Sequence, residues 1–427
     1  MDSNNTHTGS GEKKDLFFRL LPKFSAILSA FMLVVPIIIA VKQAQIMQAS
    51  DFVMTFYIIG KMISAGHAQG IYPDAHSTSF IGAPFDLYAH SVLPALPVDH
   101  TAIFMYCPAV AWIFSAFSNL EPIQALIIWQ GICILALLLC VYIHSRDSKT
   151  NFFQLLGLGA LFTPVFHQLL IGHLSIPLGM MPLSVGYFLL CSNHFLAGGM
   201  VWALLFLKIQ YLPTVLLVLG ALFLSGKFRA PLGFLLGTLM VALVNIFCLG
   251  SDVARNWLSC LRLSDAIFSD PRYGYPHYLA VSIPSMVLQT VPSEMRDAAK
   301  LPAYLLAALI GLGTLWYASK LFAKHDIKSQ LANVMLLGIF VLPLVLPHFL
   351  FYDLCCFSIA ALIIYGNNWD EKTSKRLKRI RIYTFVCINL YFINFFFLGL
   401  GIGYFPTFTI LVCILTFAYI QIVRTIR

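Results

Sequence analysis

The chain has 427 residues, of which 59% are hydrophobic and only 11% are charged. Soluble domains carry roughly 25% charged residues, so this composition excludes an ordinary soluble protein and predicts several membrane-spanning helices. The net charge of +9 does not indicate nucleic-acid binding, because the basic residues are spread between the apolar segments.

The chain begins with a polar tail over residues 1–23, which we expect to lie in the cytoplasm, and continues as one integral membrane domain over residues 24–427. The first apolar segment, 24–46, is too long for the core of a signal peptide and should remain as an anchor. A transmembrane helix needs about 20 apolar residues. Twelve further candidates follow at 102–118, 122–143, 152–168, 175–191, 196–208, 210–225, 231–250, 301–319, 331–346, 350–366, 382–400 and 404–424.

The positions of the basic residues decide which of these segments span the bilayer. The positive-inside rule places short basic loops in the cytoplasm. If 102–118 is re-entrant or interfacial, twelve segments cross, both termini are cytoplasmic and every short basic loop lies on the same side: Arg146/Lys149, Lys227/Arg229, Lys320–Lys328 and Lys372–Arg381. We therefore predict an all-α polytopic membrane protein with about 12 transmembrane helices and juxtamembrane or re-entrant helices in the first outer loop.

Two long segments, about 47–121 and about 251–300, are predicted to lie outside the membrane. Both are rich in Tyr, Pro, Trp and His, which favours the outer interface. The topology also needs the short apolar segments on either side of Lys208-Ile209-Gln210 to form a hairpin. A short, broken pair of helices often marks a cavity, and the alternative is one long tilted helix.

The acidic residue Asp51 follows the first predicted span by about five residues, and so is expected at the outer boundary of the membrane. A carboxylate close to an apolar surface has a raised pKa and is a better base. Asp51 is therefore a candidate general base. The alternative is an N-cap for a helix that begins at Phe52.

A second polar constellation, from Leu346 to Asp353, is predicted at an outer turn on the same side as Asp51. Its residues His348 and Tyr352 are four apart and can share a helical face. A histidine there can donate to a phosphate oxygen or to an incoming hydroxyl. The alternative is a histidine that only caps the turn.

Cationic side chains complete the candidate site. Lys208, at the tip of the hairpin, either pairs with a phosphate or extends to the interface. Arg255, Arg262 and Arg272 in the second outer loop either hold a lipid phosphate or lie on a solvated face. His173, between two spans, is either functional or structural. Together these residues indicate an outward-facing cavity that suits a lipid-linked phosphate donor.

Signatures of several other chemistries are missing from the sequence. There is no nucleotide-binding glycine loop, no H-E-x-x-H, no C-x-x-C and no D-x-D pair. The sequence therefore predicts no cofactor and no metal site, and it disfavours ATP-driven transport and nucleotide-sugar chemistry. The ten cysteines are interpreted as small core residues.

Five short motifs occur in a characteristic order. They are Asp51-Phe52…Phe56-Tyr57, Ile71-Tyr72-Pro73-Asp74, Phe104-Met105-Tyr106-Cys107-Pro108, Leu207-Lys208 and Pro347-His348…Tyr352-Asp353. With these motifs, the chain resembles the polyprenol-phosphate-dependent mannosyltransferases of the C-type membrane glycosyltransferase (GT-C) superfold, in particular glycosyltransferase family 87. The resemblance runs from about residue 45 to about residue 355.

The resemblance implies that Asp51 is the general base, that His348 lies at the reacting centre and that Lys208 helps to bind the donor phosphate. It also implies inversion at the anomeric carbon, transfer on the outer side of the membrane, and no need for a metal. The candidate donor- and acceptor-binding set comprises Lys208, Gln210, His173, Tyr106, Tyr352, Asp353, Arg255, Arg262 and Arg272.

We therefore expect an enzyme of the bacterial inner membrane that moves a hexose, in first place mannose, from a polyprenyl-phosphate sugar to a lipid or glycan acceptor. One alternative is a lipid-linked saccharide transporter or flippase, which would move intact substrate and tolerate loss of the Asp51 carboxylate. The other is a glycan polymerase or ligase, for which a much larger outer loop is expected. An assay with labelled polyprenyl-phosphate mannose distinguishes the three. The enzyme would transfer the mannose, the flippase would only move the intact donor, and the polymerase or ligase would do neither.

Overall fold

The computed structural model describes residues 9–426 apart from 75, 95, 98, 99, 147, 265, 266, 268–270, 274–278 and 400–405. The described residues are largely helical, which confirms the predicted all-α class, and one isolated antiparallel bridge pairs Ala280 with Leu350. The first half of the chain contains α1 (Gly9–Lys42), α2 (Ala44–Met47), η1 (Phe52–Tyr57), α3 (Ile58–Ser64), η2 (Ala68–Gly70), α4 (Pro84–Val92), α5 (Pro108–Ser115), α6 (Pro122–Ser145), α7 (Phe152–Ala160), α8 (Thr163–Ile171), η3 (Ser175–Met180), α9 (Met181–Cys191), α10 (Phe195–Trp202), η4 (Ala203–Leu207) and η5 (Ile209–Tyr211). The second half contains α11 (Leu212–Leu224), α12 (Arg229–Leu249), α13 (Ser251–Cys260), η6 (Leu261–Leu263), η7 (Pro271–Tyr273), α15 (Ile283–Thr290), η9 (Ser293–Met295), α16 (Arg296–Lys324), α17 (Ile327–Val345), η10 (Phe351–Cys355), α18 (Cys356–Gly366), α19 (Glu371–Gly399) and α20 (Pro406–Ile426).

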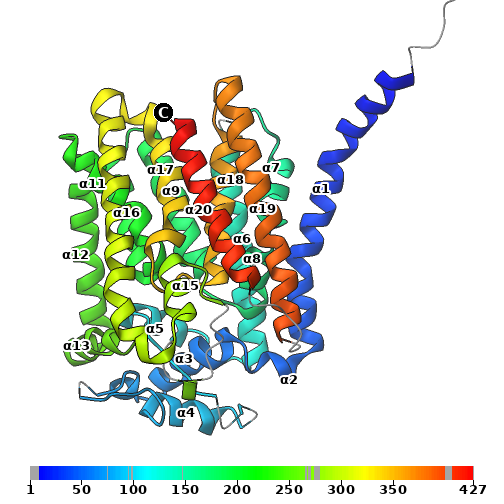
Figure 1. The fold of residues 1–427 in the computed structure, drawn as a ribbon. Helices are drawn as coiled ribbons and strands as arrows, with labels where there is room; N and C mark the ends of the chain where they lie inside the picture. The colour runs from blue at the N-terminus through cyan, green and yellow to red at the C-terminus, as the bar shows by residue number, and fades with distance from the viewer. Residues whose placement is uncertain are drawn as a thin grey trace, which may run out of the picture.

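The long helices form a bundle, and the short ones collect at one end of it. Figure 1 shows α12, α16, α17, α19 and α20 running along the length of the bundle, while α2 to α5 and α13 lie together at what we call the short-helix end. The start of α1 and the end of α20 both lie at the opposite end (Figure 1). The turns from α6 to α7, α16 to α17 and α18 to α19 lie there too, and they carry three of the four basic loops named above.

Six helices in the described part of the chain are long and apolar enough to cross a membrane: Ser25–Lys42, Pro122–Ser145, Arg229–Leu249, Arg296–Lys324, Ile327–Val345 and Thr409–Ile426. The pair α7 and α8, bent by 71°, makes a seventh if it counts as one span. The chain is thus an integral membrane protein by composition and helix length. The count of twelve stays a prediction, because it also needs α19 and four shorter apolar segments to cross: Ser175–Cys191, Phe195–Leu207, Ile209–Leu224 and Phe351–Gly366.

The segment at 102–118 does not form a crossing helix. Its helix, α5, has only eight residues and is therefore about 12 Å long. It begins at Pro108, whose missing N–H has no helical partner at the first position in any case. The neighbouring α3 and α4 have seven and nine residues, so the first predicted outer loop consists of short helices.

The helical backbone is interrupted at Lys208, where the tip of the hairpin was predicted. The backbone there has φ −141° and ψ 80°, outside the helical region. On one side of the break α10 packs against α9 and α12, and on the other side α11 packs against α16 and α17. The alternative of one long, continuous helix is therefore wrong.

Glycines let the first arm of this hairpin approach α12 closely. A Cβ on Gly199 would lie 2.1 Å from the carbonyl oxygen of Ala230, and a Cβ on Gly233 would lie 2.0 Å from that of Leu196. Small residues at such contacts allow apolar helices to pack by van der Waals attraction within a membrane. This contact fixes α10 and, through it, the depth at which the hairpin turns.

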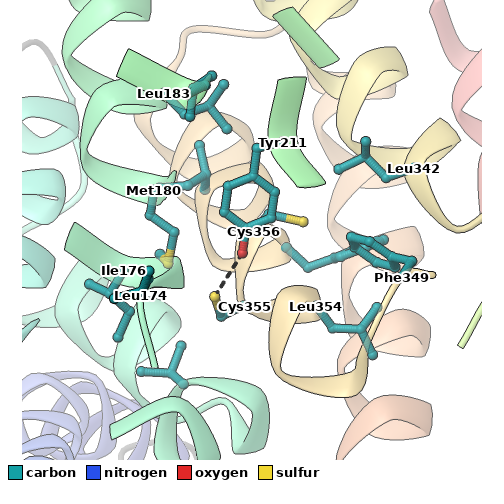
Figure 2. Close-up of a cluster of buried hydrophobic side chains, with 14 of the residues drawn as sticks. Leu174, Ile176, Met180, Leu183, Tyr211, Leu342, Phe349, Leu354, Cys355 and Cys356 are labelled. Carbon is teal, nitrogen blue, oxygen red and sulfur yellow. Dashed lines mark hydrogen bonds between the residues drawn. The ribbon is translucent and has the colours of Figure 1, made fainter. Parts of the chain in front are cut away.

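The second arm is held by a buried apolar cluster, which Figure 2 shows around Tyr211. Side chains from η3 and η10 surround this ring, and its hydroxyl lies 3.1 Å from the sulfur of Cys355. The predicted core role of the cysteines holds for six buried free thiols: Cys107, Cys133, Cys140, Cys260, Cys355 and Cys356. It is wrong for Cys413, which is exposed, while Cys191, Cys248 and Cys387 are only partly buried.

Candidate functional site

A buried ion pair joins the hairpin tip to the turn that follows α17. Lys208 Nζ lies 2.8 Å from Asp353 Oδ1, and neither side chain has any exposed surface. Burying two charges is costly, and good geometry with additional hydrogen bonds must offset that cost. The surroundings of Asp353 supply such hydrogen bonds.

Asp353 is the centre of this arrangement. The Ser175 hydroxyl donates to its Oδ1 at 2.9 Å, and the Leu350 backbone N–H donates to its Oδ2 at 3.3 Å. The Tyr211 hydroxyl donates to the Asp353 carbonyl oxygen at 2.9 Å. Three segments far apart in sequence, η3, η5 and η10, therefore meet at one residue, Asp353.

The network continues from Ser175 to His173. Because the Ser175 hydroxyl gives its proton to Asp353, it accepts a hydrogen bond from His173 Nδ1–H, at 3.2 Å. The neutral ring then accepts at Nε2 from the Tyr106 hydroxyl, at 2.8 Å. A continuous polar chain thus runs from Tyr106 through His173, Ser175 and Asp353 to Lys208.

Gly172 determines where His173 enters this network. It ends α8 in the left-handed conformation, with φ 70°, which only glycine adopts without strain. Its backbone lies against the turn after Asp51, because a Cβ on Gly172 would be 2.6 Å from Phe52 Cβ and 2.7 Å from Leu126 Cδ1. The Gln168 carboxamide also donates to the His173 carbonyl oxygen.

We expect Gly172→Ala to lower the stability of the protein by about 2 kcal/mol or more. The left-handed conformation costs about 1–2 kcal/mol for a residue with a Cβ, and overpacking adds about 1–3 kcal/mol. Thermal unfolding in detergent micelles measures the change. Gly131→Ala within α6 is the matched control, since a Cβ there meets no atom within 4 Å; equal melting temperatures for the two variants would contradict this account.

Aromatic rings surround the charged groups. Lys208 Nζ lies 5.4 Å from the ring centroid of Tyr352 and 5.9 Å from that of Tyr106. The rings of His173 and Tyr352 are 4.1 Å apart, and Phe56 lies 5.2 Å from Tyr106. The ring faces attract the ammonium group and exclude water, which strengthens the local electrostatic interactions.

Asp51 lies beside this network, at the start of the π-helical turn η1. Its side chain makes no capping hydrogen bond, and Ser50 Oγ accepts the Val53 N–H instead, at 3.5 Å. Burial raises the pKa of the Asp51 carboxyl to about 6, while the Lys208 charge opposes the shift and the Asp353 charge adds to it. The residue as a whole remains partly exposed.

The second predicted outer loop braces the turn after α17. The Val281 N–H donates to the Phe349 carbonyl oxygen at 2.7 Å, and the Ser285 hydroxyl donates to that of Pro347. His348 lies between these two braced residues and is partly buried.

The imidazole of His173 belongs to the polar network. The sequence singled out His348 for the reacting centre, and that role stays a prediction. His348 lies on the turn that precedes η10, and Asp353 is on η10 itself. The structure therefore brings together six of the predicted site residues: Asp51, Tyr106, His173, Lys208, Tyr352 and Asp353.

The remaining predicted residues lie around this group. Gln210 follows Lys208 on η5, and its Oε1 is buried without a hydrogen-bond partner in the described part of the chain. Arg255 is 73% exposed and lies 3.5 Å from Asp252, while Arg262 and Arg272 are also exposed. The arginines therefore lie on a solvated face in this structure.

Sequence reasoning did not select Ser175, Gln168 or Tyr211, although each holds a member of the network in place. Gln168 and Ser175 are polar residues within apolar segments, and such residues usually face the interior of a bundle. This placement could have identified Gln168 and Ser175 from the sequence. For Tyr211 the sequence offers only a weaker indication, its position three residues after Lys208.

The family model described as glycosyltransferase family 87 matches residues 104–347, more than half of the chain. The chain belongs to glycosyltransferase family 87. No curated protein and no solved structure matches it.

As a family 87 protein, the chain is a membrane glycosyltransferase. The matched residues include Tyr106, His173 and Lys208, whereas Asp51 precedes them and Asp353 follows them. The structure thus joins the matched part of this glycosyltransferase to flanking residues in one site. Among its described residues there is no group of three or more His, Cys, Asp or Glu side chains that can hold a metal ion.

Proposed function

We propose that this family 87 glycosyltransferase moves a hexose, in first place mannose, from a polyprenyl-phosphate sugar to an acceptor hydroxyl. Asp51 acts as the general base, and transfer proceeds with inversion at the anomeric carbon. The observation that carries the proposal is the Asp51 carboxyl, whose pKa is raised by burial and which lies beside the buried Lys208–Asp353 pair.

The chemistry of direct transfer needs two things from the protein. A base must take the proton of the acceptor hydroxyl as it attacks the anomeric carbon. Cationic or hydrogen-bonding groups must stabilise the negative charge that develops on the departing phosphate. Asp51 supplies the first and Lys208 supplies the second, within a site lined by aromatic rings.

In this proposal Lys208 acts together with Asp353. An ammonium group has three N–H donors, and the Asp353 carboxylate lies close to one side of it. The ion pair therefore orients Lys208 while the donor phosphate binds to another of its N–H groups. Asp353 is a positioning residue here, because it acts through Lys208 and through Ser175.

The distribution of charge supports a site that faces outward. The basic turns in Figure 1 lie at the end of the bundle opposite the short helices, and Asp51 lies between α2 and η1 at the short-helix end. By the positive-inside rule the basic end is cytoplasmic, so we place Asp51 toward the outer side of a bacterial inner membrane.

The test is to incubate the purified full-length protein in lipid vesicles with radiolabelled polyprenyl-phosphate mannose and membrane lipids as acceptors. Transfer of label to a product of inverted anomeric configuration supports the proposal. Movement of intact donor between leaflets without transfer would support a flippase instead. Transfer of whole glycans from a lipid diphosphate, and not of single mannose units, would support a polymerase or ligase.

The rate of transfer should depend on pH in a way set by Asp51. A general base works in its deprotonated form, so we expect kcat/KM to fall about tenfold per pH unit below about 6 and to level off above it. Initial rates between about pH 4.5 and about pH 8 measure this profile. A profile that is flat through pH 6 would argue against Asp51 as the base.

A further inference from the structure

α19 and α20 form a groove at the end of the bundle that lies opposite Asp51. The groove encloses about 980 Å³ of space, counting the part open to the surroundings. One face of each helix lines it: Arg376, Arg379 and Tyr383 on α19, and Ile414, Phe417 and Arg424 on α20. The end of α20 lies at the basic end in Figure 1, so the arginines lie at that end too.

The three arginines of this groove have no ion-pair or hydrogen-bond partner among the described residues. Other cations on the same helix have partners. Lys375 lies 2.6 Å from a Glu371 oxygen, and Arg381 lies 4.3 Å from the ring centroid of Phe385. Positive charge is therefore concentrated in the groove without a neutralising group in the part of the chain that the structure describes.

The wall of the groove changes from charged to apolar along its length. On α20 Arg424, Gln421, Phe417 and Ile414 follow one another at three- or four-residue spacing, so they share a face. Arg424 follows Ile414 by ten residues, which corresponds to about 15 Å along the helix. Phe417 is 55% exposed, so the apolar part of the groove is open to the bilayer.

We propose that this groove binds one anionic phospholipid, with its phosphate on Arg376, Arg379 and Arg424 and an acyl chain along Phe417 and Ile414. Positive clusters next to a membrane span attract anionic headgroups. Guanidinium groups suit a phosphate, because they offer paired donors in one plane. A free phosphate ion would use the arginines but not the apolar wall, and so the graded lining favours a lipid. The proposal does not depend on the reaction at Asp51.

The test uses full-length protein that has been stripped of lipid in detergent. Phosphatidylglycerol and phosphatidylcholine with identical acyl chains are added separately, and bound lipid is counted by native mass spectrometry. We expect wild-type protein to retain phosphatidylglycerol at least tenfold better, and we expect thermal unfolding to shift upward with phosphatidylglycerol only. Equal retention of the two lipids would overturn the proposal.

One triple variant and its matched control locate the site. Arg376→Gln, Arg379→Gln and Arg424→Gln combined should abolish the preference for phosphatidylglycerol. The control combines Lys324→Gln, Lys372→Gln and Lys375→Gln, which removes the same charge from exposed residues outside the groove. If the arginine variant kept the preference for phosphatidylglycerol, or if the control lost it, the assignment would be contradicted.

Phe417→Asn separates a lipid from a free phosphate and keeps all three arginines. It should weaken phosphatidylglycerol binding several-fold, while inorganic phosphate should compete poorly with the lipid in wild-type protein. If inorganic phosphate displaces the lipid fully, and Phe417→Asn has no effect, the groove is an anion site and not a lipid site.

Discussion

Replacing Asp51 with Asn is expected to lower sugar transfer by about 10²–10⁴-fold, while the protein still folds and still binds the donor. Asn has the shape of Asp but cannot accept the proton of the acceptor hydroxyl. The substitution should not lower the melting temperature, because the Asp51 side chain makes no capping hydrogen bond and burial disfavours its charged form. Initial rates with labelled polyprenyl-phosphate mannose measure the loss, and equilibrium binding of the same donor is the second readout.

Asp252→Asn is the matched control for this experiment. Asp252 lies on α13 at the short-helix end, is 71% exposed and pairs with the exposed Arg255. Its substitution should leave transfer at the wild-type rate. If the Asp51 variant transferred sugar at the wild-type rate, Asp51 would not be the general base. An equal loss of donor binding and transfer would instead mean that Asp51 serves binding and not proton transfer.

The charged members of the site could be predicted from sequence because charge is conspicuous in a chain this apolar. Asp51, Lys208 and Asp353 each stand at the boundary of an apolar segment. Ionisable residues in such places are costly unless they serve each other or a substrate, which marked them as candidates, although their pairing with each other was not predicted. The structure does bring Lys208 and Asp353 into direct contact and adds the charge of Asp51 nearby.

The choice between the two histidines could not be made from sequence. Pro347-His348 and Gly172-His173 are both short motifs at the ends of apolar segments. Their positions relative to the ion pair depend on backbone turns, and the left-handed Gly172 brings His173 next to Ser175 and Tyr106. Nothing in the residue types reveals that turn in advance.

Other parts of the arrangement are tertiary in origin. Ser175 and Asp353, which share a hydrogen bond, are 178 residues apart in the chain. The π-helical turns η1 and η3, which adjoin Asp51 and His173, have no sequence signature, although such turns are frequent at functional sites. The fold class followed from composition alone, whereas the hairpin at Lys208 needed the additional rule that basic loops share one side.

Breaking the Lys208–Asp353 pair from either side should destabilise the protein strongly. Lys208→Met leaves a buried carboxylate without its cation, and Asp353→Asn leaves a buried ammonium without its anion. An uncompensated buried charge costs about 3–5 kcal/mol. The double variant removes both charges, so its loss should be smaller than the sum of the single losses, by about 1–3 kcal/mol. Thermal unfolding of the four proteins in one detergent gives the comparison.

The same four proteins separate a structural lysine from one that contacts the donor. If Lys208 only balances Asp353, the double variant should regain transfer together with stability. If Lys208 also binds the departing phosphate, the double variant should fold but still transfer at least tenfold more slowly than wild type, about 1.4 kcal/mol of barrier. Donor binding should weaken in parallel, because the lost contact is to the phosphate. Strictly additive losses of stability would instead mean that the two charges do not depend on each other, contrary to their 2.8 Å contact.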